Sequence, residues 1–116
     1  MDEIEILIND GVLRINGHIC DMAFPVAYAI QIGKKAIVLF DIPAGVVKND
    51  NVACFDDSCV LLWTIQPSPH GGTADDPYVS LWLSEDSVVV TLTWSGVEYQ
   101  VNIVDGTVTA SGTRRF

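Results

Sequence analysis

The chain has 116 residues, of which 49% are hydrophobic and 18% charged, which predicts one folded domain over residues 1–116 and excludes a disordered chain. Six Lys and Arg residues against fifteen Asp and Glu residues give a formal net charge of −9, which argues against a nucleic acid as partner. No apolar run reaches the roughly 18 residues that span a bilayer, and the first residues lack the basic flank of a signal peptide, so we expect no membrane partner and a cytoplasmic location.

Apolar and polar residues alternate with a period of two along most of the chain, which is typical of half-buried β-strands. In the first half, this alternation and short apolar runs predict strands at residues 4–8, 12–16, 26–32, 36–42, 51–55 and 60–65. Turn residues such as those at 9–11 and 33–35 separate neighbouring strands. Residues 21–24 are the only candidate for a turn of helix.

The same pattern continues in the second half of the chain, with strands expected at residues 78–83, 88–94, 97–103 and 107–111. Ser95-Gly96 and Asp105-Gly106 between these runs are typical of tight hairpin turns. The sequence therefore predicts an all-β fold, an antiparallel meander of nine or ten short strands that forms a sandwich or rolled barrel with little or no helix. Residues 43–50 and 66–77 interrupt this meander as longer loops.

The three tryptophans are assigned from the same alternation. Trp63 and Trp94 fall on apolar strand faces and are expected in the core. Trp82 falls on the face opposite Leu81 and Leu83, where it is either part of a second core layer or a binding anchor. Because tryptophan is buried on average, the core position is favoured for Trp82 as well.

The three cysteines show no paired spacing. Cys54 and Cys59 flank a short turn, where a disulfide across the hairpin is geometrically feasible. In a reducing cytoplasm, free and partly buried thiols are favoured instead.

Residues 51–65 resemble the repeat of β-propellers that bind pyrroloquinoline quinone, in which a short strand ends in an acidic turn and an aliphatic strand with a tryptophan follows. Residues 93–107 are similar to the next strand pair of such a blade. The chain also resembles small bacterial β proteins of uncharacterised function, some of which are immunity proteins against toxins. One or two blades do not close a propeller ring, so the resemblance implies β-hairpins and no quinone site.

No arrangement of residues indicates catalysis or a cofactor. His18 and Cys20 share one strand face, but zinc requires four donors and the other cysteines do not complete a recognisable spacing. No serine lies in a nucleophile elbow. The paired acids Asp56-Asp57 and Asp75-Asp76 fall in turn segments, where Asp bonds the backbone and stays hydrated. We therefore expect a protein that is not an enzyme and holds neither metal nor cofactor.

An acidic surface on a domain without catalytic groups predicts a binding protein, most specifically an immunity or inhibitor protein that blocks a basic toxin or nuclease by protein–protein contact. The predicted site is the loop at residues 66–77, in which prolines limit disorder. The residues assigned to partner binding are Asp75, Asp76, His70, Tyr78, Trp82, Asp56 and Asp57. Neutralising Asp75 and Asp76 is expected to slow association and to leave thermal stability nearly unchanged.

The alternative is a structural or assembly module, for example a phage or secretion-apparatus subunit. Two strands suggest this alternative, the edge strand at residues 4–8 and the Thr- and Val-rich last strand, because unpaired strand edges can pair between subunits. Glu3 and Glu5 place charge on the first of these edges, which counts against such pairing.

Overall fold

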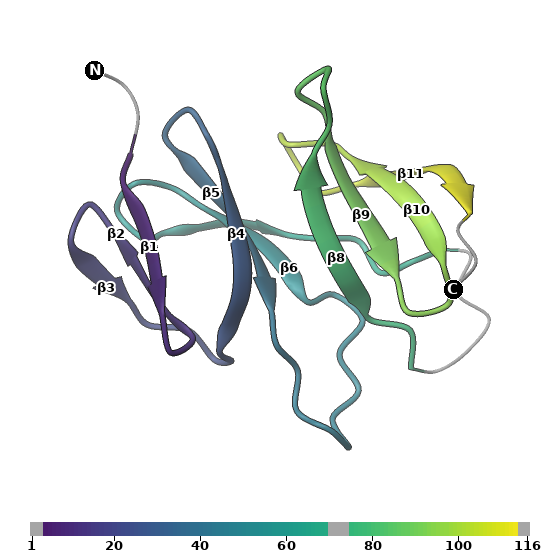
Figure 1. The fold of residues 1–116 in the computed structure, drawn as a ribbon, viewed down its shortest axis with the longest axis horizontal. Helices are drawn as coiled ribbons and strands as arrows, with labels where there is room; N and C mark the ends of the chain where they lie inside the picture. Colours follow the sequence, from purple (N-terminus) through teal and green to yellow (C-terminus); the bar gives the residue numbers. More distant parts are fainter. Residues whose placement is uncertain (1–3, 70–74, 114–116) are drawn as a thin grey trace.

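The computed structural model describes residues 4–69 and 75–113, and these residues form eleven antiparallel strands in three sheets (Figure 1). The first sheet contains β1 (Ile6–Asn9), β2 (Val12–Ile15) and β3 (His18–Cys20). The middle sheet contains β4 (Val26–Ile32), β5 (Lys35–Phe40), β6 (Val52–Phe55) and β7 (Leu61–Thr64). The third sheet contains β8 (Tyr78–Leu83), β9 (Val89–Thr93), β10 (Val97–Val101) and β11 (Val108–Thr113).

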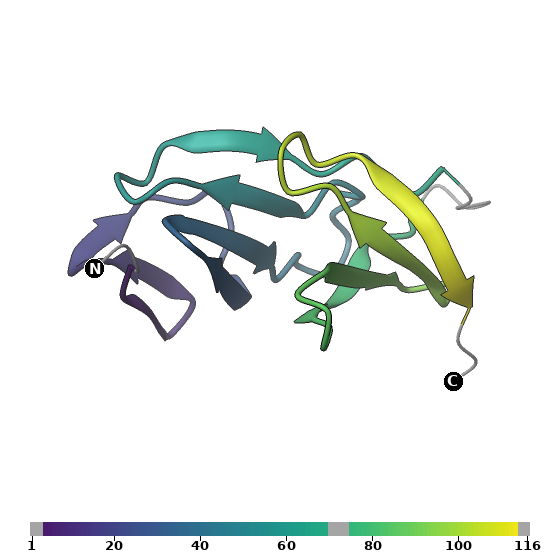
Figure 2. The same ribbon diagram turned by 90° about the horizontal axis from the view of Figure 1, so that it is seen from above.

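Each sheet is a meander, in which strands that are consecutive in the sequence lie next to each other and pair. The three sheets are stacked face to face. In Figure 2 they fan out along an arc, with β7 and β11 on the outer side and the first strands β1, β4 and β8 on the inner side. Strand β4 contacts both β1 and β8. The middle sheet is therefore covered on both faces.

The larger core lies between the middle and third sheets. Alternate residues of β5 and β6 point into it, among them Ile37, Val52 and Cys54, and meet Tyr78 and Tyr99 from the third sheet. The rings of the two tyrosines are in edge contact, with centroids 6.3 Å apart, which is a favoured aromatic geometry.

The smaller core lies on the opposite face of the middle sheet. Ala36, Val38 and Phe55, which alternate with the residues of the larger core, pack there against Leu13 and Ile15 of β2. Strands buried on both faces read as continuous apolar runs, which explains why residues 36–40 and 51–55 contain few polar side chains.

The predicted all-β antiparallel meander is confirmed. The sandwich-like arrangement has three layers, and the strand that the sequence analysis did not count is the short β3. Residues 21–24 form no helix, and only residues 23 and 24 are bends. None of the described residues forms a helix of the length and apolarity needed to cross a membrane.

The prediction that Trp94 is a core residue is wrong. Strand β9 ends at Thr93, and Trp94 begins the turn to β10 with 70% of its surface exposed. The face of β9 that enters the larger core carries Val89, Thr91 and Thr93. The Thr91 hydroxyl donates to the carbonyl oxygen of Ser80 at 2.7 Å, so a buried threonine on this face carries no unsatisfied donor. Trp63 is buried as expected.

The expectation for the cysteines is confirmed for Cys54, which is free and buried, and is wrong for Cys59, which forms a disulfide with Cys20. Cys54 points into the larger core and Cys59 packs against the smaller one, so these two side chains lie on opposite sides of the middle sheet. The observed bond joins residues 39 positions apart. It ties β3 of the first sheet to the turn after β6.

The two segments that resemble propeller repeats fall in different sheets. Residues 51–65 carry β6 and β7 of the middle sheet, and residues 93–107 carry β10 and the turns on either side of it. Across the described residues the three sheets form an arc rather than a closed ring (Figure 2). The relation to that repeat stays a prediction.

Candidate functional site: a platform of three loops

Three chain segments meet where the middle and third sheets end side by side. They are the loop between β5 and β6 (residues 41–51), the segment before β8 (residues 75–77) and the turn between β9 and β10 (residues 94–96). We call these residues the loop platform. The predicted binding loop, residues 66–77, contributes its last three residues to this platform.

Asn51 is buried at the contact between the middle and third sheets. Its side-chain nitrogen donates to the carbonyl oxygens of Tyr78 at 2.8 Å and Phe40 at 3.3 Å. Its side-chain oxygen accepts from the backbone nitrogen of Tyr78 at 2.9 Å. A buried amide with these partners is satisfied, and it fixes the start of β8 against the end of β5.

Asp76 connects all three segments. Its carboxylate accepts hydrogen bonds from the backbone nitrogen and the hydroxyl of Ser95, each at 2.8 Å. Its backbone nitrogen donates to the side-chain oxygen of Asn49 at 2.9 Å. The backbone nitrogen of Trp94 donates to the carbonyl oxygen of Pro77 at 2.9 Å. Hydrogen bonds to a carboxylate are strong, so the backbone that carries Trp94 is held firmly.

The platform presents apolar side chains to solvent. Trp94 is 70% exposed, and Val46 and Val47 in the loop between β5 and β6 are 41% and 60% exposed. Asp75, in the segment before β8, is also exposed. An exposed tryptophan on a backbone held by hydrogen bonds is the type of residue that is enriched in protein-binding hot spots.

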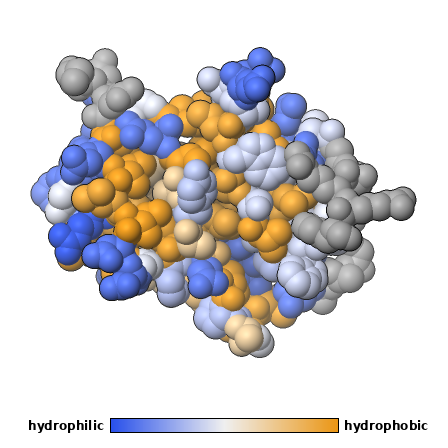
Figure 3. Space-filling view, in the orientation of Figure 1, coloured by the Kyte–Doolittle hydropathy of each residue, from blue (hydrophilic) through white to orange (hydrophobic). Residues whose placement is uncertain are grey.

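A shallow groove of about 220 Å³ adjoins the platform between β4 and β8. Its lining includes Ala27, Phe40, Ile42, Pro77 and Val79. Figure 3 shows hydrophobic side chains gathered on this inner side of the arc, over the first strands of the sheets. The apolar surface of the platform is therefore continued by the groove through Pro77, which belongs to both.

The structure places the other predicted site residues as follows. Tyr78 is 2% exposed, and its hydroxyl donates to the carbonyl oxygen of Gln66 at 2.6 Å. Desolvation by burial, followed by the nearby Tyr99 and Asp76, raises the Tyr78 pKa above its usual value. Trp82 is half-buried on the outer face of the third sheet, across from Val90. Neither side chain lies in the platform's exposed surface.

Asp56 and Asp57 lie in the turn at the far end of β6, away from the platform. The Asp56 carboxylate accepts from the backbone nitrogens of Ser58 at 2.8 Å and Val60 at 3.0 Å, which stabilises the turn as the sequence analysis expected. Asp76 was expected to be solvated, but it is 2% exposed. His70 lies outside the described residues.

Sequence reasoning missed Asn49, Asn51 and Trp94. Nothing in the sequence indicates that the two asparagines are structural, because asparagine is also common in exposed turns, and the residue type alone does not distinguish the two positions. For Trp94 a signal existed, since the residue directly precedes Ser95-Gly96. A tight turn at that pair ends the strand before the tryptophan.

The reactive groups of the described residues are few. Desolvation by burial is the main cause that raises the pKa of the Cys54 thiol from 9.0 to about 11, so the thiol remains protonated at neutral pH and is a poor nucleophile. Hydrogen bonds from Thr107 lower the pKa of Asp105 in the turn after β10. No group of three His, Cys, Asp or Glu side chains in the described part of the chain is arranged to hold a metal ion.

No curated protein matches the chain in sequence. A family model described as a domain of unknown function (DUF7957) matches residues 3–113, a range that includes all three sheets, the loop platform and both disulfide cysteines. With nearly its whole length matched, the chain belongs to the family described as a domain of unknown function (DUF7957).

Proposed function

We propose that this chain is a non-catalytic binding protein that acts by protein–protein contact through the loop platform. Its most specific form is an immunity or inhibitor protein that blocks a basic toxin or nuclease, as the sequence resemblance implies. The observation that carries the proposal is the exposed Trp94 on a turn held by the buried Asp76 carboxylate. A contact residue whose backbone is already held in place loses less conformational entropy when it binds.

The charge of the chain supports a basic partner. With a net charge of −9, the protein attracts positively charged surfaces, which speeds encounter and disfavours acidic partners. The turns of Asp56-Asp57 and Glu85-Asp86 lie at strand ends away from the platform. They therefore contribute long-range attraction, while Trp94 and Asp75 supply the contact.

The test is a pull-down from native cells with the tagged protein and the Trp94→Ala variant. Val104→Ala is a matched control, because Val104 is 77% exposed in the turn at the other end of β10. We expect the wild type and the control to recover one basic protein, and Trp94→Ala to reduce its recovery about tenfold or more. Recovery of no basic protein, or equal recovery by all three, contradicts the proposal.

A structural or assembly module is the second candidate, and the edge strands favour it. Strands β4 and β8 form edges of their sheets, and neither contains a charged residue. Uncharged edges are the kind that pair between chains. Sedimentation at millimolar concentration separates the candidates, because a protein that remains monomeric there is not an assembly subunit of this kind.

The predicted cytoplasmic location remains part of the proposal, and the disulfide between Cys20 and Cys59 bears on it. Disulfides persist in oxidising compartments and are rare in the cytoplasm. Trapping thiols with an alkylating reagent at the moment of cell lysis measures the state of the pair directly. A fully oxidised pair in native cells contradicts the cytoplasmic location.

A further inference from the structure

The first sheet has one strand fewer than each of the other two sheets. Within the described residues it has three strands, whereas the middle and third sheets have four each. Strand β1 lies against β4, and Cys20 at the end of β3 shares the smaller core with Phe55 of β6 and is bonded to Cys59 in the turn between β6 and β7. The position that a fourth strand of the first sheet would take therefore lies over β7.

An apolar groove occupies that position. It measures about 360 Å³. Its apolar lining includes Met22, Phe40, Phe55 and Leu61, and Cys59 of the disulfide also borders it. Leu61 is 53% exposed, although the corresponding faces of β5 and β6 are covered by the first sheet.

The outer edge of β3 borders a second opening, of about 420 Å³. His18 and Ile19 of β3 line it together with Asp57 and Cys59. Ile19 is 61% exposed. Strand β3 pairs only with β2 in the described part of the chain, and the residues that follow it, Asp21 and Met22, line the first groove. The two openings thus follow one strand edge on either side of Cys59.

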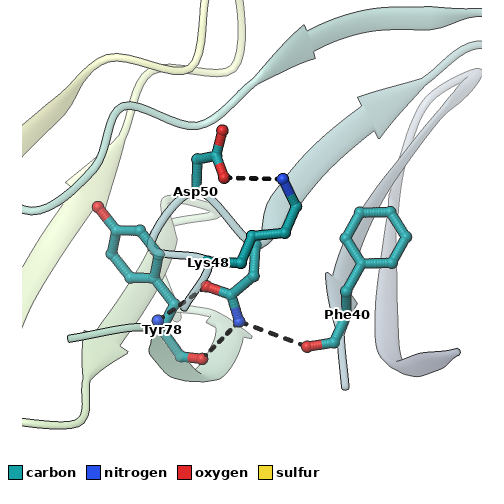
Figure 4. Close-up of polar contacts among 5 residues, drawn as sticks. Phe40, Lys48, Asp50 and Tyr78 are labelled. Atoms are coloured by element: carbon teal, nitrogen blue, oxygen red, sulfur yellow. Dashed lines mark hydrogen bonds and ion pairs between the residues drawn. The ribbon is translucent and has the colours of Figure 1, made fainter. Parts of the chain in front are cut away.

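The charges along this edge are mostly negative. Lys48 forms an ion pair with Asp50 at 2.9 Å, and both line the first groove (Figure 4). Asp21 borders the same groove and Asp57 the second opening. Three carboxylates against one ammonium group leave the edge with a net negative charge.

We propose that the edge of β3 and the groove over β7 accept an extended segment of a partner protein as a fourth strand of the first sheet. The segment pairs its backbone with β3, as peptides do in β-augmentation. It places an aliphatic side chain against Met22, Phe55 and Leu61, and basic side chains beside Asp21 and Asp57. This surface lies across the middle sheet from the larger core, and it does not depend on the proposed function of the platform.

The probe is a capped seven-residue peptide, Lys-Thr-Val-Thr-Val-Thr-Lys, whose lysines and valines share one face of a strand. Calorimetry with the full, oxidised chain is expected to give a dissociation constant in roughly the micromolar range. A peptide with glutamate in place of both lysines should bind about tenfold more weakly, because the edge is acidic. A peptide with methylated backbone nitrogens should bind at least as poorly, since it lacks the donors for strand pairing.

Leu61→Asp is the matching protein variant, and Leu62→Asp is its control. Leu62 is 44% exposed on the same strand and does not line the groove. We expect Leu61→Asp to weaken peptide binding about tenfold or more and Leu62→Asp to leave it unchanged. In hydrogen exchange, the bound peptide should slow exchange in β3.

Several results overturn the proposal. They are no binding at millimolar peptide, equal binding of the methylated peptide, and equal loss with Leu61→Asp and Leu62→Asp. A dimer of the free chain that Leu61→Asp dissociates also overturns it, because the occupant is then a second copy. Trp94→Ala should not change peptide binding. A result that contradicts the peptide site at β3 is therefore distinguishable from one that contradicts the proposed function of the loop platform.

Discussion

Opening the disulfide should cost a large part of the protein's stability. Cys20 and Cys59 are 39 positions apart in the sequence, with Cα atoms 5.4 Å apart. In the chain-entropy model, a cross-link that closes a loop of this length reduces the entropy of the unfolded chain by an amount worth about 4 kcal/mol at 25 °C. At about 2.1 cal/mol/K of unfolding entropy per residue, this corresponds to a Tm decrease of roughly 16 °C for 116 residues.

The assay is thermal unfolding followed by circular dichroism, with and without reductant, for the wild type and the double variant Cys20→Ser with Cys59→Ser. The double variant should melt where the reduced wild type melts and should not respond to reductant, because Cys54 forms no bond. A reductant effect below about 4 °C in the wild type refutes the reasoning. So does alkylation of three thiols in the unreduced, denatured protein.

Three further predictions concern buried groups. Asp76→Asn should destabilise the fold by about 2 kcal/mol in urea unfolding, because it removes charge-assisted hydrogen bonds to Ser95. Gly106→Ala should cost about 2 kcal/mol or more in the same measurement, since Gly106 has a φ of +79° and an added Cβ would meet the Trp63 ring. The Cys54 thiol should react with a thiol reagent only when the protein unfolds. Burial raises its pKa from 9.0 to about 11, so the unfolded chain loses this proton at lower pH than the folded protein. The free energy of unfolding should therefore fall as the pH rises from about 9 to about 11.

The first two of these predictions have a matched control variant. Asp86→Asn removes an exposed carboxylate and should change stability by less than about 0.5 kcal/mol; a loss equal to that of Asp76→Asn contradicts the role of the buried group. Gly33→Ala shares the positive φ but meets no atom within 4 Å, so it should cost less than Gly106→Ala. For Cys54, fast reaction of the folded protein with the thiol reagent contradicts the burial argument. So does a free energy of unfolding that does not change above pH 9.

The fold class followed from local sequence because strand pairing in this protein is local. Every strand pairs with its neighbour in the sequence, so alternation and turn residues were enough to place ten of the strands. The stacking of the sheets depends on which face of each strand is buried. For β9 both faces are buried and are apolar or carry threonine, so alternation alone does not tell which face meets the larger core, and it placed Trp94 on a buried face although the strand ends at Thr93.

The candidate site was harder to predict, since it depends on contacts between distant residues. The Asp76 carboxylate meets Ser95, 19 residues away, and the Asn51 amide meets Tyr78, 27 residues away. An acid in a Pro- and Gly-rich loop has the same sequence signature whether it is hydrated or buried. The disulfide was missed for the same reason, because pairing of cysteines cannot be deduced from their spacing alone.

The two proposed surfaces meet in one short segment of the chain. Asn49 and Asn51 bond to the start of β8 and the segment before it, whereas Lys48 and Asp50, which alternate with them, line the groove over β7. A partner that displaces this segment at one surface therefore also displaces the lining of the other. Residues that share a backbone segment commonly show non-additive effects. We expect Trp94→Ala and Leu61→Asp, measured singly and together, to have additive effects on the free energy of peptide binding, and a departure from additivity contradicts the independence of the two surfaces.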